Sequence, residues 1–585
     1  MYRIPLLAAA LWLAVASAGF AQSTYYVSTF GADEPTRDGR TPATAWASLA
    51  YACEQVPGNV AAADTIQVGA GLFVAERAAT PAPGTVIEGA GSDATTIRAS
   101  AAWTMLERPQ NAVWQDYLIA FDKFALGYDG QTTAANFTVR DLRLESTLTN
   151  LTNGAIYFRD AEDALFERLH VEDFAWSAIH LIACKRVEVR DSHFENANRV
   201  EDDFFMGQVY GRVVEELRVH DNAFRNTVPG DRQWGVGYKG RNHFDCQIYD
   251  NDFATGDGFD IEVPFEQEWG LEIYGNRFNR TVSVPKGGPN GDPATRGFTY
   301  SIWIHDNVFT NGYDIEGPRG YLEVSHNFFD VQNDNGRCIA TFGGDLAEPQ
   351  SIHHNVAVNI DRSFMWANAQ QDSVDFYHNT LVFAEADDRA ARMVDVRQSA
   401  RGWTVRNNLF IAPAAQPREV GAAVNQGSTV FEGNLVNEGL DPALPSGNYR
   451  DQDPGLGATG ASPATTLAPL SAVSFVVDRG VPMGLPFEGA APDIGAYEYQ
   501  TDVVSARGAR ALALTVFPNP VADELTFDSE TSGAFQLYDA KGALVRRGGV
   551  VAGRNTLALG TLARGHYRLV VIGRRGELRW AAVVR

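Results

Sequence analysis

Residues 217–224 read LRVHDNAF, and this phrase decides the fold because close copies of it recur along the chain. In each copy, an alternating apolar run leads to a polar residue and then to Asn-x-Phe or a relative of it. The clear copies are CQIYDNDF (246–253), LEIYGNRF (271–278), IWIHDNVF (302–309), LEVSHNFF (322–329), SIHHNVAV (351–358), VDFYHNTL (374–381), TVRNNLF (404–410) and VFEGNLV (430–436). Weaker copies are FTVRDLRL (137–144) and VEVRDSHF (187–194).

The asparagines of these copies set the period of the repeat. They follow at intervals of 29, 25, 31, 20, 28, 24, 29 and 26 residues, at Asn222, Asn251, Asn276, Asn307, Asn327, Asn355, Asn379, Asn408 and Asn434. A repeat with a constant β-strand part and a variable remainder is typical of a parallel β-solenoid, whose like side chains stack in columns. A β-propeller would need four strands per blade of ~40 to 50 residues. We therefore predict an all-β, right-handed parallel β-helix in which the repeated Asn and Phe residues are scaffold.

The ends of the repeat region are predicted to be capped. In residues 44–56, TAWASLAYACEQV, the side chains of Trp46, Leu49, Ala50, Cys53 and Val56 fall on one helical stripe, which indicates a helix covering the first coil. The runs DTIQVGAGLF (64–73) and TVIEGAG (85–91) resemble the opening of secreted pectin-lyase-like β-helix proteins, and APDIGAYEY (491–499) resembles their closing strand. We therefore expect the N-terminal cap and the first coils at residues 22–100, and the rest of the β-helix at residues 101–499.

The first 21 residues have the features of a signal peptide. Arg3 supplies a positive charge, residues 6–15 are apolar, and Gly19-Phe20-Ala21 is a small-x-small cleavage site. We expect the mature protein to contain no transmembrane segment, because no later apolar run reaches ~18 residues.

The C-terminal residues form a separate module. After a linker at 500–512, residues 513–585 contain short runs in which apolar and polar residues alternate. This pattern predicts short strands that form a small antiparallel β-sandwich. The motifs FPNP, LYDAKG and LARGHYRLVV resemble the type A sorting domain of the type IX secretion system of Bacteroidetes. The resemblance implies the type IX machinery as a partner, passage through the periplasm, and release or attachment at the outer cell surface.

The charge of the chain limits the ligands that it can bind. The 48 basic and 72 acidic residues give a formal net charge of −24, which disfavours nucleic acid as a ligand. A polyanionic ligand would therefore need a local basic cluster or a bridging cation. The four cysteines are far apart and show no CxxC spacing, so we expect them to be buried thiols. Separately, we expect the protein to be a monomer.

Residues 230–292 hold the densest run of candidate functional residues. Asp260 and Glu262 alternate along a predicted strand and so should share a face, which suggests a bound cation such as calcium. A strand about one coil earlier, and Lys286 about one coil later, should stack against that face. The candidate residues are Lys239, Arg241, His243 and Lys286 for catalysis, Arg232, Trp234 and Trp269 for substrate binding, and Asp257, Asp260 and Glu262 for calcium.

The phrase at 260–288 resembles the calcium-dependent chondroitinase B and alginate lyase family. The resemblance implies that Asp260 and Glu262 hold calcium, whereas the family's lysine position falls near Gln267 and its arginine position at Pro285 or Lys286. We therefore expect a secreted, polysaccharide-active protein, and first of all a lyase for a uronate-containing polysaccharide. Two alternatives remain open: a non-enzymatic glycan-binding adhesin, and a glycoside hydrolase with a carboxylate pair from Asp231, Asp257, Asp260 and Glu262.

Overall fold

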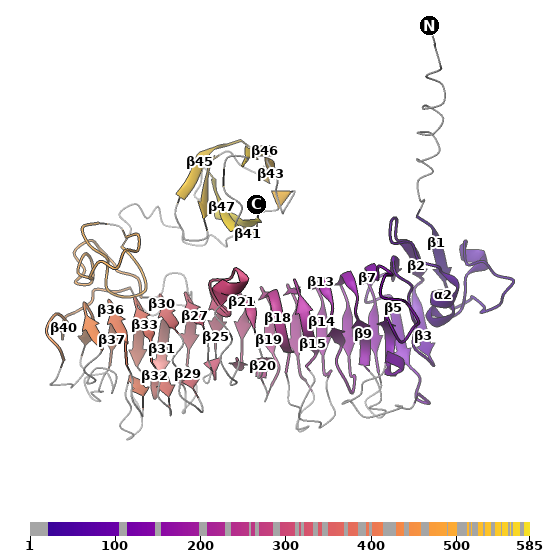
Figure 1. Ribbon diagram of the computed structural model, residues 1–585, viewed down its shortest axis with the longest axis horizontal. Helices are drawn as coiled ribbons and strands as arrows, with labels where there is room; N and C mark the ends of the chain where they lie inside the picture. The colour runs from indigo at the N-terminus through magenta and orange to yellow at the C-terminus, as the bar shows by residue number, and fades with distance from the viewer. Residues whose placement is uncertain are drawn as a thin grey trace, which may run out of the picture. The chain divides into compact units, whose positions relative to one another are not determined.

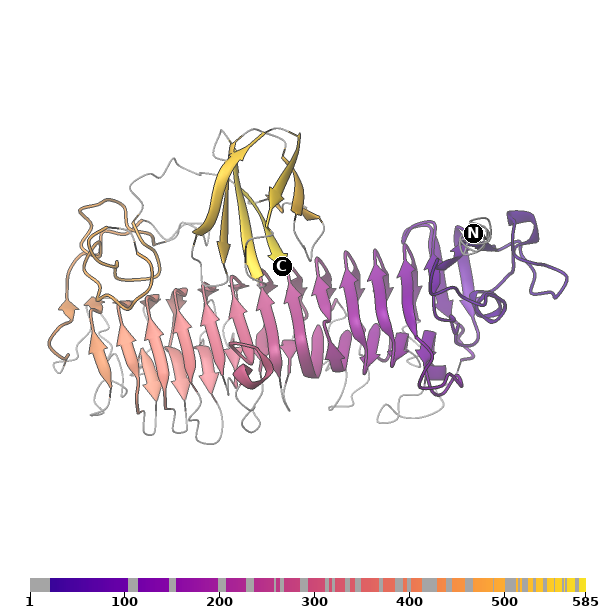
Figure 2. The ribbon, with the colours of Figure 1, turned by 45° about the horizontal axis from the view of Figure 1, so that its top comes forward.

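The chain folds into two units, residues 1–499 and 500–585. The computed structural model describes residues 22–103, 114–146, 154–197, 207–227, 236–256, 259–263, 268–284, 293–310, 315–317, 321–331, 337–341, 349–367, 372–383, 393–396, 401–412, 429–437, 444–457, 467–487, 489–499 and, in the second unit, shorter stretches between 512 and 584. The first unit is a parallel β-helix, as predicted, whose strands stack side by side along one axis (Figures 1 and 2).

Each coil has three sides, as the coil of β12 (Ile179–Ile182), β13 (Lys185–Arg190) and β14 (His193–Glu195) illustrates. The first side comprises β6 (Tyr117–Asp122), β9 (Gly154–Arg159), β12, β15 (Val209–Glu215), the first part of β18 (Tyr238–Tyr249), β20 (Phe259–Glu262), β23 (Thr281–Ser283), β26 (Ile315–Glu316), β29 (Arg337–Thr341), β32 (Ser363–Ala367) and β35 (Val394–Val396). The second side comprises β1 (Thr24–Val27), β2 (Asp64–Val68), β4 (Thr85–Glu88), β7 (Ala135–Arg140), β10 (Glu162–Glu167), β13, β16 (Arg218–His220), the rest of β18, β21 (Trp269–Tyr274), β24 (Ile302–His305), β27 (Leu322–Ser325), β30 (Gln350–His353), β33 (Val374–Tyr377), β36 (Thr404–Arg406) and β38 (Val430–Glu432).

The third side is a separate parallel sheet. It comprises β3 (Gly71–Ala75), β5 (Thr95–Ala99), β8 (Arg143–Glu145), β11 (His170–Glu172), β14, β17 (Ala223–Arg225), β19 (Asp252–Ala254), β22 (Arg277–Phe278), β25 (Val308–Phe309), β28 (Phe328–Asp330), β31 (Val356–Ile360), β34 (Thr380–Phe383), β37 (Leu409–Ile411), β39 (Leu435–Asn437) and β40 (Tyr449–Arg450).

The repeated asparagines form a buried ladder at the corner between the second and third sides, as predicted. Asn355 is typical: its backbone N–H and its Nδ2 both donate to Oδ1 of Asn379, at 3.1 and 3.0 Å, and Nδ2 also donates to the carbonyl of Val324 at 2.9 Å. The ladder extends one step further than the repeat indicated, because Asn434 donates in the same way to Asn448. Each step satisfies polar groups that the turn would otherwise bury unpaired.

The phenylalanines of Asn-x-Phe stack inside the third side. Rings of successive coils lie 4.5 to 5.2 Å apart, along Phe194, Phe224, Phe253, Phe278, Phe309 and Phe329. This column and the buried aliphatic residues of all three sides form one continuous core. The repeated Asn and Phe residues are therefore scaffold.

The helix that covers the first coil is shorter than residues 44–56. It is α2, Leu49–Gln55, and the side chain of Ser48 caps it by accepting from the backbone N–H of Tyr51. Trp46 precedes the helix and instead bridges Val27 of β1. The five residues of the predicted stripe are nevertheless all buried, so the cap forms the expected apolar contact.

Residues 491–499, all described, contain no strand, contrary to the expected closing strand. Ile494 instead packs against Leu409, Leu435 and Val476, so an irregular segment covers the last coils. In the second unit, β44 (Gly533–Asp539), β45 (Leu544–Val550), β47 (His566–Gly573) and β48 (Leu578–Val584) pair antiparallel, and β41 (Leu512–Ala513) joins β48 in parallel. A second sheet contains β42 (Val516–Phe517), β43 (Glu524–Ser529) and β46 (Gly553–Ala558). All four cysteines of the chain are buried free thiols.

Candidate functional site

The first side carries a column of polar and aromatic side chains that includes Lys239. Lys239 of β18 is opposite Glu262 of β20, and Nζ of the lysine lies 2.6 Å from Oε2 of the glutamate. Their side chains are only 9% and 17% exposed. In the preceding coils the same column contains Tyr210, His180 and Tyr157, each opposite the next. The coil period predicted the meeting of Lys239 and Glu262, and the structure places the two residues in contact.

A second column, two residues further along the same strands, is basic. It begins with Asp122, which pairs with Arg159, and it continues with Ile182, Arg212 and Arg241 on successive strands. Arg212 and Arg241 occupy adjacent rungs, ~4.8 Å apart at the backbone. The first side therefore has the local basic cluster that an anionic ligand requires on a chain of net charge −24.

The aromatic part of the first column is uncharged near neutral pH. Burial, followed by the charge of Arg212, lowers the pKa of His180 to about 3, and Nδ1 of its ring lies 2.8 Å from the hydroxyl of Tyr117. Burial raises the pKa of Tyr157 to about 12.

Sequence reasoning missed Tyr210 and Arg212. A signal existed: VYGR at 209–212 and YKGR at 238–241 end in the same Gly-Arg and are offset by 29 residues. This is the interval between Asn222 and Asn251, so the two segments occupy equivalent positions in successive coils.

His243 lies inside the β-helix rather than beside Lys239, which corrects the expected grouping. Asn242 has a left-handed backbone conformation, with φ of 58°, so the alternation of the strand is broken and the next side chain turns inward. The imidazole is fully buried: Nδ1 donates to Glu268 at 2.5 Å, and Nε2 accepts from the hydroxyl of Tyr238 at 2.5 Å.

Two glycines make room for this internal triad of Tyr238, His243 and Glu268. A Cβ on Gly240 would lie 2.5 Å from Nε2 of His243, and a Cβ on Gly211 would lie 2.7 Å from the hydroxyl of Tyr238. The triad is therefore part of the core and does not contact the first-side surface.

Asp260 also differs from the expected arrangement. Its strand is irregular between Phe259 and Ile261, and its carboxylate is fully buried. The carboxylate accepts from Thr255 Oγ1 at 2.6 Å and from two backbone N–H groups, of Asn279 at 2.7 Å and Arg280 at 2.6 Å. Burial raises its pKa to about 6.

These contacts do not fit the expected calcium site. The oxygens of Asp260 are used within the fold, and Glu262 is paired with Lys239 instead of sharing a cation with Asp260.

Of the remaining candidate residues, the structure describes only Trp269 and Arg241. Trp269 begins β21 on the second side, and the guanidinium of Arg296 lies over one face of its ring, 5.4 Å from the centroid. Arg241 is on the first side, as described above. Outside the described residues lie Asp231, Arg232, Trp234, Asp257, Gln267, Pro285 and Lys286.

Comparison with known proteins identifies the C-terminal module. Residues 515–579 match the family described as secretion system C-terminal sorting domain. The chain therefore contains a sorting domain for export through the type IX secretion system. No curated protein matches the chain. Among the described residues, no helix has the length and apolar character needed to cross a membrane.

Several solved structures are similar to this chain at low sequence identity. The A-module of the Azotobacter vinelandii mannuronan C-5 epimerase AlgE6 has 12% identity and a TM-score of 0.36, over 62% of this chain and 93% of that one. The Streptococcus pneumoniae surface adhesin PfbA has 10% identity and a TM-score of 0.39, over 55% and 84%. The tailspike protein of E. coli bacteriophage HK620, in complex with a pentasaccharide, has 10% identity and a TM-score of 0.40, over 91% and 92%. At such identities only the fold is compared, so function must be argued from the site.

Proposed function

We propose that this exported protein, released from the cell or attached to its outer surface, cleaves a uronate-containing polysaccharide by β-elimination on the first side of the β-helix. The observation that carries the proposal is the stacked pair Arg212 and Arg241 beside the column of Tyr210, Lys239 and Glu262. Guanidinium groups bind carboxylates through two parallel hydrogen bonds, so two of them on adjacent rungs suit a sugar acid.

The arginines would neutralise the uronate carboxylate and so acidify the hydrogen on C5. Lys239 is the proposed base, and it first passes its own proton over 2.6 Å to Glu262. Lys239 takes the C5 proton, the bond between C4 and the glycosidic oxygen breaks, and a C4–C5 double bond forms. The hydroxyl of Tyr210, one rung earlier, supplies the proton that the leaving oxygen needs.

A glycoside hydrolase is the second candidate, and one observation favours it. Glu262 and Glu316 lie in the same column with Ser283 between them. Two rungs separate their strands by about 9.6 Å, which is close to the about 6.5–9.5 Å between the carboxyl groups of inverting glycosidases. Such an enzyme would produce new reducing ends without a double bond.

The deciding experiment incubates the purified chain with alginate, pectin and chondroitin, with calcium and with a chelator. Ultraviolet absorbance detects the unsaturated uronate, and a reducing-end assay detects any cleavage. The test variants are Lys239→Met and Glu262→Gln. Lys185→Met is a matched control, because Lys185 of β13, on the second side, forms an ion pair of the same 2.6 Å length with Glu215 at the end of β15.

We expect unsaturated product from the wild type and from Lys185→Met, and at least a ~100-fold lower rate from Lys239→Met, since general base catalysis contributes at least that much. Reducing ends without absorbance would replace the lyase with the hydrolase. Binding of a glycan without any cleavage would replace both with an adhesin.

A further inference from the structure

Four of the eleven histidines gather at one corner of the β-helix, where the second side meets the third. His326, His354 and His378 each precede a ladder asparagine and have φ of 56°, 52° and 49°. Their rings stack at 4.9 and 5.0 Å between centroids. His353 ends β30 directly before His354. In earlier coils, aspartate commonly occupies this corner position, as at Asp191, Asp221, Asp250 and Asp306.

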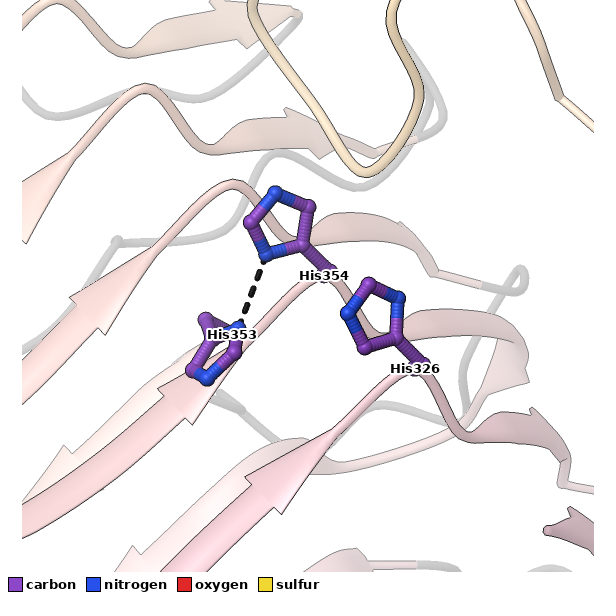
Figure 3. A group of neighbouring side chains, drawn as sticks. All are labelled: His326, His353 and His354. Atoms are coloured by element: carbon purple, nitrogen blue, oxygen red, sulfur yellow. Dashed lines mark hydrogen bonds between the residues drawn. The ribbon is translucent and has the colours of Figure 1, made fainter. Parts of the chain in front are cut away.

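Three of these imidazoles bring nitrogen atoms together. The candidate ligand atoms of His326, His353 and His354 all lie within 4.8 Å of one another. Figure 3 shows the rings of His353 and His354 meeting, with His326 beside them on the neighbouring coil. The Nδ1 atoms of His353 and His354 are 2.8 Å apart, and the two rings are nearly perpendicular, at 87°.

The ring of His353 is held from behind by a carboxylate. Its Nε2 donates to Oε1 of Glu323 at 3.1 Å, so Nδ1 carries the lone pair. Glu323 is 5% exposed and also accepts from Ser325 Oγ at 3.0 Å, and Trp303 Nε1 donates to that same Oγ at 3.0 Å. A carboxylate behind an imidazole that orients its other nitrogen is the arrangement that supports histidine ligands in metal sites.

We propose that His326, His353 and His354 bind a divalent first-row transition metal such as Zn²⁺. Imidazole ligands favour Zn²⁺, Cu²⁺ and Ni²⁺ over Ca²⁺ and Mg²⁺. For both Nδ1 atoms to bind, the proton that His354 now shares with His353 moves to its own Nε2, so no proton is released. Three protein ligands leave one position of a tetrahedral ion open to water or to an outside ligand. This site is independent of the polysaccharide cleavage proposed for the first side.

A second group, His170, His193 and Glu195, is less suited to a cation. Glu195 already accepts from Thr227 Oγ1 at 2.5 Å and from His193 Nε2 at 3.2 Å. The positive charge of Arg143 lies close enough to lower the pKa of His170, after the larger effect of burial. A neighbouring guanidinium repels a metal ion; the charges that act on His326 and His354 are instead those of other histidines, opposed at His326 by the carboxylates of Asp306 and Glu323.

The test is calorimetric titration of the full chain, without a polyhistidine tag, with Zn²⁺. We expect the wild type to bind one equivalent more than the double variant His326→Ala/His354→Ala. Glu323→Gln should keep the site but weaken it by ~10-fold or more, because it removes only the group behind His353. Two controls, His193→Ala and His220→Gln, should keep this equivalent; His193→Ala breaks up the second group, and His220→Gln breaks a comparable Glu–His pair.

Circular dichroism and the metal-free melting temperature of each variant establish that it is folded. Equal Zn²⁺ binding by the wild type and the folded double variant overturns the proposal. Loss of the equivalent in His193→Ala assigns the metal to the other group and also overturns it. If the double variant does not fold, the comparison of Glu323→Gln with His220→Gln decides, and equal affinities overturn the proposal.

Discussion

Nε2 of His220 lies 3.0 Å from Oε1 of Glu188, one strand away on the second side. Nδ1 of the same ring lies 2.7 Å from Asp221, so the imidazole bridges two carboxylates. Burial alone would lower the pKa of His220, but these two hydrogen bonds outweigh it and raise the pKa to about 9.

This bridge predicts a loss of stability at alkaline pH. A histidine pKa that is raised in the folded state contributes stability fully below its unfolded value of about 6.5, and the contribution is lost as pH rises through about 9. We expect the melting temperature of the wild type to fall across this range more than that of His220→Gln. The difference should correspond to about 1 kcal/mol, because the two carboxylates are partly exposed and screened. Parallel melting curves for the two proteins at every pH would contradict the bridge.

The asparagine ladder predicts a large effect from one buried amide. Asn355→Ala removes the side-chain donor to Val324 and Asn379, and it removes the acceptor of the Asn327 backbone N–H and one acceptor of the Asn327 Nδ2. Unpaired buried groups cost about 1–3 kcal/mol each, so we expect a clear drop in the melting temperature. Asn437→Ala, at the half-buried end of β39 outside the ladder, is the control and should change it little. Equal drops in both variants would mean that the ladder is not a special source of stability.

The fold was predictable from sequence because its signal is local and repeated. Each Asn-x-Phe phrase specifies a strand, a left-handed corner residue and an inward ring, and the period aligns them across coils. The same period correctly placed Lys239 opposite Glu262. It failed for His243 because strand alternation predicts side-chain direction only while the backbone stays extended, and Asn242 is left-handed.

Asp260 was misplaced for a related reason. The irregular pairing between Phe259 and Ile261 has no marker in the alternation of FDIE. The partners of its carboxylate, Thr255 and the backbone of residues 279–280, come from other parts of the coil. Local pattern predicts the strand, whereas the use of a buried carboxylate depends on which distant groups reach it.

The internal triad predicts that His243 contributes to stability and has no direct part in catalysis. Glu268→Leu would leave the Nδ1 hydrogen of His243 and the N–H groups of Asn242 and His243 without an acceptor in a dry interior. We expect a loss of about 3–5 kcal/mol, as for other broken buried pairs, seen as a lower melting temperature or as insoluble protein. A folded variant should keep its polysaccharide activity per folded molecule. A selective loss of activity in a protein of unchanged stability would place the triad in the reaction after all.

The stacked arginines make the final prediction, which concerns binding and is separable from cleavage. Arg212→Gln/Arg241→Gln should weaken polyuronate binding by ~10- to 100-fold, since each charge-assisted hydrogen bond lost is worth about 1.5–3 kcal/mol and the exposed position of Arg212 reduces the effect. The matched control is Arg277→Gln, at an exposed arginine on the third side, which makes the negative net charge larger by one without changing the first side. Affinity electrophoresis at several salt concentrations measures the polyuronate affinity of the double variant and of the control. If the net charge of the chain governed binding, Arg277→Gln would weaken it by a similar factor per charge, and added salt would remove the difference between the variants. If a uronate carboxylate is held between Arg212 and Arg241, the double variant alone loses affinity, and neutral glycans bind both proteins equally.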